Sequence, residues 1–152
     1  MASQNRALAD MRIRNKVIIS VVNRQEVLLS EGYDPVRDFR FYIPVGGGVE
    51  FGETIHAAAK RELFEELGIR DQSLAFIEFH ESFFEFNGTQ EHEIMFHFVC
   101  HISDEQRNLL APTGIESSGE QFPIAWHSRG SLESIKKSLV PPEIFHDLTN
   151  IL

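Results

Sequence analysis

Alternating and continuous runs of hydrophobic residues predict strands in the first third of the chain. The stretches KVIISVV (16–22) and EVLLS (26–30) are rich in β-branched and aliphatic residues, and the polar residues between them predict a hairpin turn. Residues 31–38 contain Gly, Asp and Pro, which predicts a loop. FRFYIPV (39–45) predicts a short strand that ends at Pro44, before three glycines.

The middle of the chain predicts one helix followed by a long hairpin. The helix covers residues 54–67, with Thr54 as its N-terminal cap and Gly68 as its C-terminal stop. Two strand-like segments follow, at 73–86 and 90–102, and the Asn-Gly pair between them is a strong hairpin signal. The second strand places Ile94, Phe96, Phe98, Cys100 and Ile102 on one face, and Glu91, Glu93, Met95, His97, Val99 and His101 on the other. We predict that the first face is core and that the second, mixed face borders a site.

The last third predicts a strand and two helices after an irregular segment. Residues 104–120 are polar, with a short helix expected at their start, and 121–127 predict a strand. Residues 131–139 predict a short helix. Pro141-Pro142 then open a final helix with one apolar stripe: Ile144, Phe145, Leu148, Ile151 and Leu152. The order of elements predicts an α/β fold in which helices cover both sides of a mixed sheet, within a single domain over 1–152.

Composition narrows the class of partner. The 152 residues include 42% hydrophobic and 24% charged residues, as in ordinary globular proteins. The net charge of −9 argues against unaided binding to nucleic acid or to an anionic membrane, but it permits an anionic substrate that arrives with a cation. Cys100 is the single cysteine, so no intramolecular disulfide can form and a reducing compartment is expected. Residues 1–10 predict a polar arm or short helix without a signal sequence, and we expect a cytoplasmic protein.

Three glutamates crowd one side of the predicted helix. Because residues on an α-helix advance by 100°, Glu62, Glu65 and Glu66 fall within an arc of about 100°. The other side of the helix is apolar and is expected to face the core; it carries Leu63, Phe64 and Leu67. Like charges at this spacing destabilise a helix by about 0.2–0.5 kcal/mol per pair. A divalent cation would remove the repulsion, and carboxylate oxygens are natural ligands for Mg²⁺ or Mn²⁺.

Glycines precede this helix. Gly46, Gly47 and Gly48 allow the backbone to come close to a ligand, and they place backbone carbonyls near the acidic face. A carbonyl there could add one more oxygen ligand. The pattern therefore predicts a metal site that can hold phosphate.

The joint spacing resembles a known motif. Gly47, five residues, Glu53, seven residues and then RELFEELGI (61–69) match the Nudix box, G-x5-E-x7-R-E-U-x-E-E-x-G-U, at every fixed position. PVGGGVEFGE (44–53), HEI (92–94) and the late Trp126 are also similar to a Nudix subgroup of mostly unassigned substrate. Many members have proline directly before the two glycines, whereas this chain has Val45 there and Pro44 one position earlier.

The resemblance implies a fold, an activity and a set of site residues. The fold would be an α/β/α sandwich with a mixed sheet, and the reaction would be hydrolysis of a nucleoside diphosphate linked to a moiety X. By position in the motif, the metal ligands would be Glu62, Glu65, Glu66 and the carbonyl of Gly46, with Mg²⁺ or Mn²⁺ as the cofactor. Glu53 and Arg61 would pair and hold the loop against the helix.

Residues outside the motif leave several roles open. The general base could be a glutamate of the motif, Glu93 or Glu91, both of which lie on the mixed face of their strand. A ring of X could rest on Phe41, Tyr42, Phe83 or Phe84, and Arg37 or Arg40 could meet a phosphate, with none of these favoured. His97 and His101 would lie about 13 Å apart on a strand, too far to share one metal ion. Buried Cys100 is expected to be structural.

Three functions compete. The first is a Nudix pyrophosphohydrolase that acts on nucleoside triphosphates, sugar nucleotides, dinucleoside polyphosphates or RNA ends, with small molecules favoured by the acidic charge. The second is a non-catalytic ligand sensor of the same fold, which would usually lack a glutamate or the arginine of the motif. The third is a Ca²⁺-binding or purely structural acidic helix, which has no EF-hand loop to support it. The sequence does not determine the oligomeric state, and a homodimer is compatible with it.

Overall fold

The computed structural model describes residues 11–152, so the arm or helix predicted for residues 1–10 lies outside the described residues. The strands are β1 (Ile13–Asn23), β2 (Glu26–Asp34), β3 (Phe39–Ile43), β4 (Val45–Gly48), β5 (Ala75–Phe86), β6 (Thr89–His101), β7 (Thr113–Ile115) and β8 (Gln121–His127). The helices are α1 (Ile55–Leu67), α2 (Asp104–Leu109), α3 (Arg129–Ile135), which runs into a 3₁₀ turn (Lys136–Ser138), and α4 (Ile144–Ile151).

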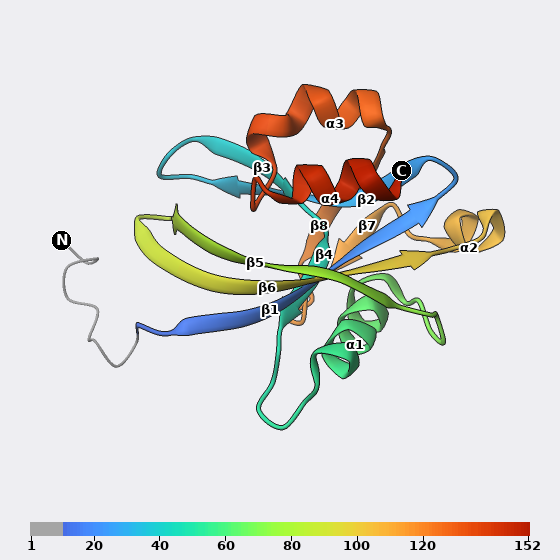
Figure 1. The fold of residues 1–152 in the computed structure, drawn as a ribbon, viewed down its shortest axis with the longest axis horizontal. Coiled ribbons are helices and arrows are strands. Elements are labelled where there is room, and N and C mark those ends of the chain that lie inside the picture. The colour runs from blue at the N-terminus through green and yellow to red at the C-terminus, as the bar shows by residue number, and fades with distance from the viewer. Residues whose placement is uncertain (1–10) are drawn as a thin grey trace.

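The strands form a mixed sheet in the order β5-β6-β1-β2-β8-β7, with β3 paired to β2 and β4 paired to β1. Strands β1 and β6 run parallel, while the other pairs are antiparallel. Helix α1 lies on one side of the sheet, and α3 and α4 lie on the other (Figure 1). The predicted α/β sandwich with a mixed sheet is confirmed.

Strand β1 lies in the middle of the fold and supplies both cores. Val17 and Ile19 pack on the side of α1, in a buried cluster that includes Leu63. Ile18 faces the opposite way and packs in the cluster that includes Leu148 of α4. This alternation follows from the two-residue period of a strand. Because both faces of this part of β1 are covered, residues 17–22 are apolar apart from Ser20.

Some predicted boundaries were wrong. Residues 31–34, predicted as loop, continue β2 and pair with β3. The glycines predicted to end a strand form the strand β4, which pairs with β1 from Ile19↔Val45 to Lys16↔Gly48. The segment 104–120 contains the short strand β7 besides the expected helix α2. In each case pairing with another strand overrides weak local propensity. The partner is the next strand along the chain for residues 31–34 and for β7, and the more distant β1 for β4.

Both faces of β6 are buried along part of their length. Phe98 and Cys100 pack on the side of α1, as predicted, and burial raises the pKa of the Cys100 thiol to about 11. The opposite face, predicted to be mixed, carries the fully buried Met95 and His97 under α4.

In the part of the chain that the structure describes, no helix combines the length and the apolar character needed to cross a bilayer.

A chain of polar contacts fastens α4 to the sheet. Asp147 of α4 accepts hydrogen bonds from His80 Nε2 at 2.6 Å and from His97 Nδ1 at 2.9 Å. The other nitrogen of His97, Nε2, lies 2.6 Å from Ser20 Oγ on β1, which therefore donates to it when Nδ1 carries the proton. Burial raises the pKa of Asp147, but the two histidine hydrogen bonds outweigh it, so the pKa is lowered. The network thus favours an ionised Asp147.

We predict that Asp147→Asn lowers the free energy of unfolding by about 2 kcal/mol at pH 7, because a neutral amide lacks the negative charge that strengthens both histidine hydrogen bonds. A carboxyl whose pKa is lowered on folding stabilises the protein above its unfolded pKa of about 3.9. The difference between wild type and variant should therefore shrink as the pH falls below about 4. Urea denaturation at several pH values measures it. The control is Asp71→Asn, at an exposed position of positive φ that asparagine tolerates. An unchanged stability in Asp147→Asn contradicts the prediction.

Candidate functional site

Helix α1 has well-defined ends. The Thr54 side chain accepts a hydrogen bond from the Ala57 N–H, and Gly68 adopts a left-handed conformation with φ of 72° while its N–H donates to the Phe64 carbonyl. Both predicted caps are confirmed. Leu63 is buried as predicted, but Phe64 is exposed rather than in the core. Its ring is covered on one side by the Arg70 guanidinium, 3.9 Å from the ring centroid.

The glutamate face of α1 turns toward the sheet and not toward open solvent. Glu62 is buried, Glu66 is half-buried and Glu65 is exposed. The N–H of Gly46 on β4 donates to Glu66 Oε2 at 3.1 Å. The structure therefore brings Glu62, Glu66 and Gly46 together at the junction of α1 and β4, with Glu65 at its outer edge.

Two of the glycines are required by close approach. A Cβ atom on Gly46 would lie 1.9 Å from the Val17 carbonyl oxygen of the paired strand. A Cβ atom on Gly47 would lie 2.3 Å from Glu62 Oε1. Gly48 is different, because a Cβ atom there would have no neighbour within 4 Å. Strand β4 (Val45–Gly48), which we call the glycine strand, thus allows the glutamate carboxylates to rest directly against backbone.

Arg61 connects the motif. Its Nε and Nη2 donate to the two carboxylate oxygens of Glu53 at 2.8 and 2.9 Å, which is a bidentate pair. Its Nη1 donates to Glu62 at 2.9 Å and to Glu65 at 3.2 Å. Nη2 also donates to the Gly48 carbonyl at 3.0 Å. The pairing of Glu53 with Arg61 implied by the motif is present, and one guanidinium orients both the loop and the glutamates.

The electrostatics differ sharply between the glutamates. Burial, followed by the charge of Glu62, raises the pKa of Glu66 to about 8. Burial also raises the pKa of Glu62, against the opposing effect of Arg61. Hydrogen bonds from Arg61 and then from the Glu50 N–H lower the pKa of Glu53 to about 2. Glu53 is thus fully paired, whereas burial disfavours the charged forms of Glu62 and Glu66, an effect that a bound cation would oppose.

A cavity of about 190 Å³ opens beside Glu66 and Gly46; we call it the glutamate cavity. Lys16 of β1 and Glu116 also line it. Neither was selected from the sequence: Lys16 begins an apolar run, and Glu116 lies in the segment predicted to be irregular. The only local signal for Lys16 is a cation at the edge of a central strand, where a charge is costly unless it has a use.

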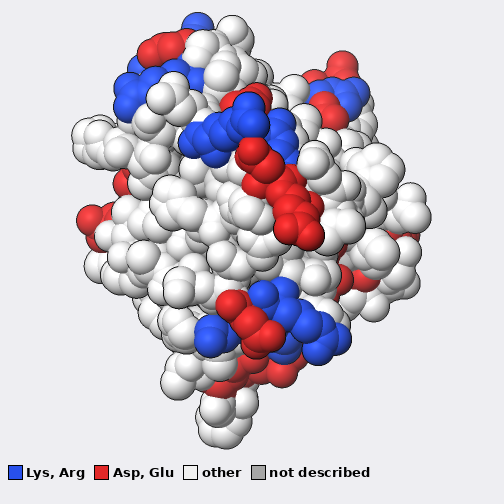
Figure 2. Space-filling view, turned by 90° about the vertical axis from the view of Figure 1, so that its right-hand side faces the viewer, with Lys and Arg blue, Asp and Glu red and all other residues white. Residues whose placement is uncertain are grey.

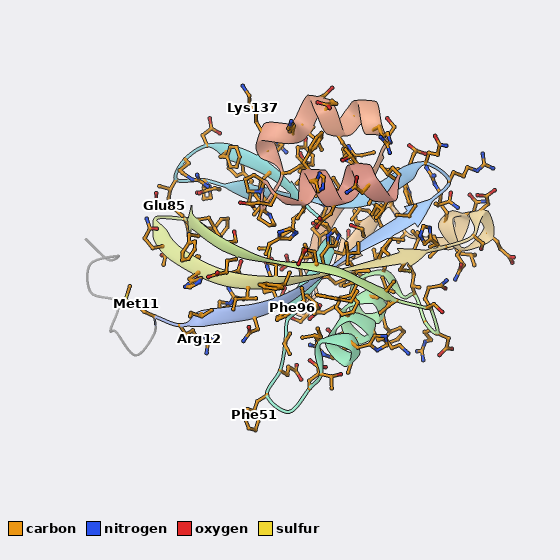
Figure 3. All side chains as sticks on the ribbon, viewed as in Figure 1. Met11, Arg12, Phe51, Glu85, Phe96 and Lys137 are labelled. Carbon is orange, nitrogen blue, oxygen red and sulfur yellow. The ribbon has the colours of Figure 1, made fainter. Side chains whose placement is uncertain are left out.

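The glutamate cavity has the donors of a site for a hard divalent cation. Glu66 and Gly46 line the cavity, and Glu62 lies one turn earlier on the same face of α1, against Gly47. Carboxylate and backbone carbonyl oxygens are the ligands that such a cation prefers. Charged side chains also gather on the surface at the height of α1, with acidic groups beside basic ones (Figure 2). Phe51 is fully exposed at the tip of the loop between β4 and α1 and points away from the molecule (Figure 3).

Most of the predicted residues outside the motif lie away from the glutamate cavity, although Phe41 lines it. Glu93 and Glu91 line a second cavity together with three of the residues considered for X or phosphate, namely Phe41, Phe84 and Arg37. The remaining candidates have other contacts: Tyr42 packs edge-on against His127, Phe83 stacks with His92, and Arg40 pairs with Glu31. Glu93 does not line the glutamate cavity, and its catalytic role stays a prediction.

The sequence analysis missed the meeting of His80, His97 and Asp147. Their ligand atoms all lie within 4.8 Å of one another, a grouping that could in principle hold a metal ion. However, the nitrogen-to-oxygen separations of 2.6 and 2.9 Å are hydrogen-bond lengths. Ligands about 2.1 Å from a tetrahedral zinc ion would be roughly 3.4 Å apart. We therefore interpret this group as the hydrogen-bonded network described above.

Several solved structures of other proteins share this fold. A MutT protein from Methanosarcina mazei Go1 superposes with a TM-score of 0.62 at 18% identity, over 93% of this chain and 96% of that one. The dihydroneopterin triphosphate pyrophosphohydrolase of E. coli gives 0.62 at 14% identity, over 91% and 97%. An Ap4A hydrolase from C. elegans gives 0.62 at 18% identity, over the same shares. At such identities the likeness shows a common fold.

The match to a family description is more specific than the structural likeness. A search of curated proteins gives no match. The family description "NUDIX domain" matches residues 11–148, a span that includes both cavities, the glycine strand and the whole of the motif. This chain therefore belongs to the Nudix hydrolase family.

Proposed function

We propose that this protein hydrolyses the pyrophosphate bond of a nucleoside diphosphate linked to another moiety X, with Mg²⁺ or Mn²⁺ as the cofactor. The observation that carries the proposal is the junction of α1 and β4, where the buried Glu62 and the half-buried Glu66 rest against glycine backbone. Family membership and the names of the structural neighbours support pyrophosphate hydrolysis in general. The metal and the class of X are our proposal.

Glu62 and Glu66 would hold the metal, with Glu65 at the exposed edge and the Gly46 carbonyl as a backbone ligand. When bound, a divalent cation neutralises the diphosphate and acidifies a water molecule. The donor set fits this role, because it consists of oxygen atoms only and carries more charge than Arg61 alone balances. Arg61 and Glu53 would position these ligands by fixing the loop to the helix.

The reaction requires little covalent chemistry from the protein. A water oxygen attacks one phosphorus in line, the bond from that phosphorus to the bridging oxygen breaks, and the second phosphate leaves with the bond electrons. The proton of the water passes to a carboxylate. Glu65, Glu93 and Glu91 are the candidates for this acceptor, and Glu65 is the exposed one on the motif. Lys16, which lines the glutamate cavity, supplies positive charge beside the phosphates.

The substrate is proposed to be a small molecule. The net charge of −9 disfavours a long polyanion, and no nucleic-acid or membrane partner is proposed. The neighbours are named for different substrates, so the fold alone does not identify X. A cytoplasmic location and a homodimer remain predictions from the sequence.

We predict hydrolysis of at least one member of a panel of nucleoside triphosphates, sugar nucleotides and dinucleoside polyphosphates in the presence of Mg²⁺ or Mn²⁺. Chelation by EDTA should abolish it. Glu66→Gln should lower kcat by about 100-fold or more, since a metal ligand and its charge are lost. Phosphate release measures the rate, and Glu105→Gln, an exposed glutamate of α2, is the control. Full activity in Glu66→Gln rejects that assignment, and binding without turnover favours a sensor.

We predict a second, steric effect at the glycine strand. Gly47→Ala should lower kcat/KM at least tenfold, because the new methyl group occupies the position of the Glu62 carboxylate. Gly48→Ala is a closely matched control, since its methyl group meets no atom within 4 Å. Both variants should show a thermal melting temperature close to that of the wild type. Equal activity in the two variants would argue that the contact of Gly47 with Glu62 is unimportant.

A further inference from the structure

The second cavity, with a volume of about 260 Å³, lies between β3 and the end of the β5–β6 hairpin; we call it the aromatic cavity. Phenylalanines from both sides form its walls: Phe39, Phe41, Phe84 and Phe86. Phe41 and Phe86 meet edge to face, with ring centroids 6.0 Å apart, which shows that the two hairpins are in contact. Glu85 also lines the cavity and lies at the hairpin end in Figure 3. Such walls suit a flat, apolar ring.

The aromatic cavity is adjacent to the glutamate cavity. Lys16, Phe41 and Ile43 line both of them. A ligand can therefore place a ring among the phenylalanines and a phosphate beside Glu66, with Lys16 between the two. This is the arrangement that a nucleotide requires, because its ring and its phosphates are joined by a short sugar.

Glu93 gives the aromatic cavity a chemical preference. Its side chain is only 2% exposed, and its Oε2 atom is buried without a hydrogen-bond partner. Two cations balance its charge from a distance, with Arg14 Nη1 at 3.9 Å and Lys16 Nζ at 3.8 Å. Both separations are too long for hydrogen bonds. A buried acceptor without a donor is uncommon and costs free energy, so it indicates a missing donor.

We propose that the aromatic cavity binds the ring of X or of the nucleoside, and that Glu93 recognises N–H donors on the edge of that ring. The proposal rests on the proposed function for the nature of the substrate. A carboxylate accepts two adjacent donors side by side, and the guanine edge presents such a pair in its ring N–H and amino group. A uracil edge presents a single N–H between two carbonyl acceptors, so it offers no adjacent donor pair and places a carbonyl oxygen beside the carboxylate. Glu93 is thus a specificity residue, and the proton acceptor of the reaction belongs to the motif.

Calorimetric titration with GMP, IMP and UMP, without divalent cation, tests the proposal apart from hydrolysis. IMP lacks the amino group, and UMP lacks the donor pair. We expect wild type to bind GMP at least tenfold more tightly than UMP, with IMP between them, and Glu93→Gln to remove most of this difference. Glu133→Gln, on the exposed surface of α3, should keep the wild-type order. Equal binding of the three nucleotides by wild type, or an unchanged order in Glu93→Gln, overturns the proposal.

A second variant guards against misfolding of the buried Glu93 substitution. Phe86→Leu alters a partly exposed wall of the cavity and should weaken all three nucleotides by a similar factor, without changing their order. Unchanged affinity in this variant would place the ring elsewhere. Steady-state kinetics complete the test. They compare wild type with Glu93→Gln on a guanine substrate and on the corresponding uracil substrate, where the protein hydrolyses both. Recognition changes KM for the guanine substrate, whereas a uniform fall in kcat for both substrates would make Glu93 the general base and overturn the proposal.

Discussion

The arrangement of the site depends on the guanidinium of Arg61, a single cation that binds several carboxylates. Arg61 binds Glu53 with two hydrogen bonds and reaches Glu62, Glu65 and the Gly48 carbonyl with the rest of its donors. It thereby fixes where the acids lie but leaves Glu66 without a cationic hydrogen-bond partner among the contacts described for it. A planar fork with five donors can do this, and a lysine could not. The acids are therefore ordered by the protein, and in the proposed function a bound cation completes their charge balance.

The glycine strand illustrates how far the sequence predicts the site. The helical repeat of 3.6 residues predicted that the three glutamates of α1 share one face, and the capping residues marked the ends of the helix. Glu53 and Arg61 were predicted from the resemblance to the Nudix box. It did not indicate that Gly46 and Gly47 form a strand, since three glycines have no strand propensity of their own. Their conformation is set by pairing with β1, which no local pattern reveals. Gly46 is needed for close approach to the Val17 carbonyl of β1, and Gly47 leaves the space that the Glu62 carboxylate occupies.

Long-range pairing explains the other differences as well. His80, His97, Asp147 and Ser20 come from four elements, so their contact cannot be inferred from any one of them. Alternation along β6 predicted that Glu93 and His97 share a face, but it could not distinguish a residue under α4 from one that lines a cavity. The burial of Glu93 follows from the packing of the β5–β6 hairpin near β3. Sequence periodicity gives a residue's side of a sheet, and only the assembled layers give its depth.

The parallel pairing of β1 with β6 also bears on how the chain acquires its structure. Everything from β2 to β5 separates the two strands, so the middle of the sheet is a contact of high sequence separation. Such contacts close slowly, because the entropy of the intervening loop must be overcome first. On a ribosome, the glutamate helix would emerge well before the strand that completes the sheet beside β1. Newly made N-terminal halves would then expose an apolar β1, which is the kind of surface that chaperones bind.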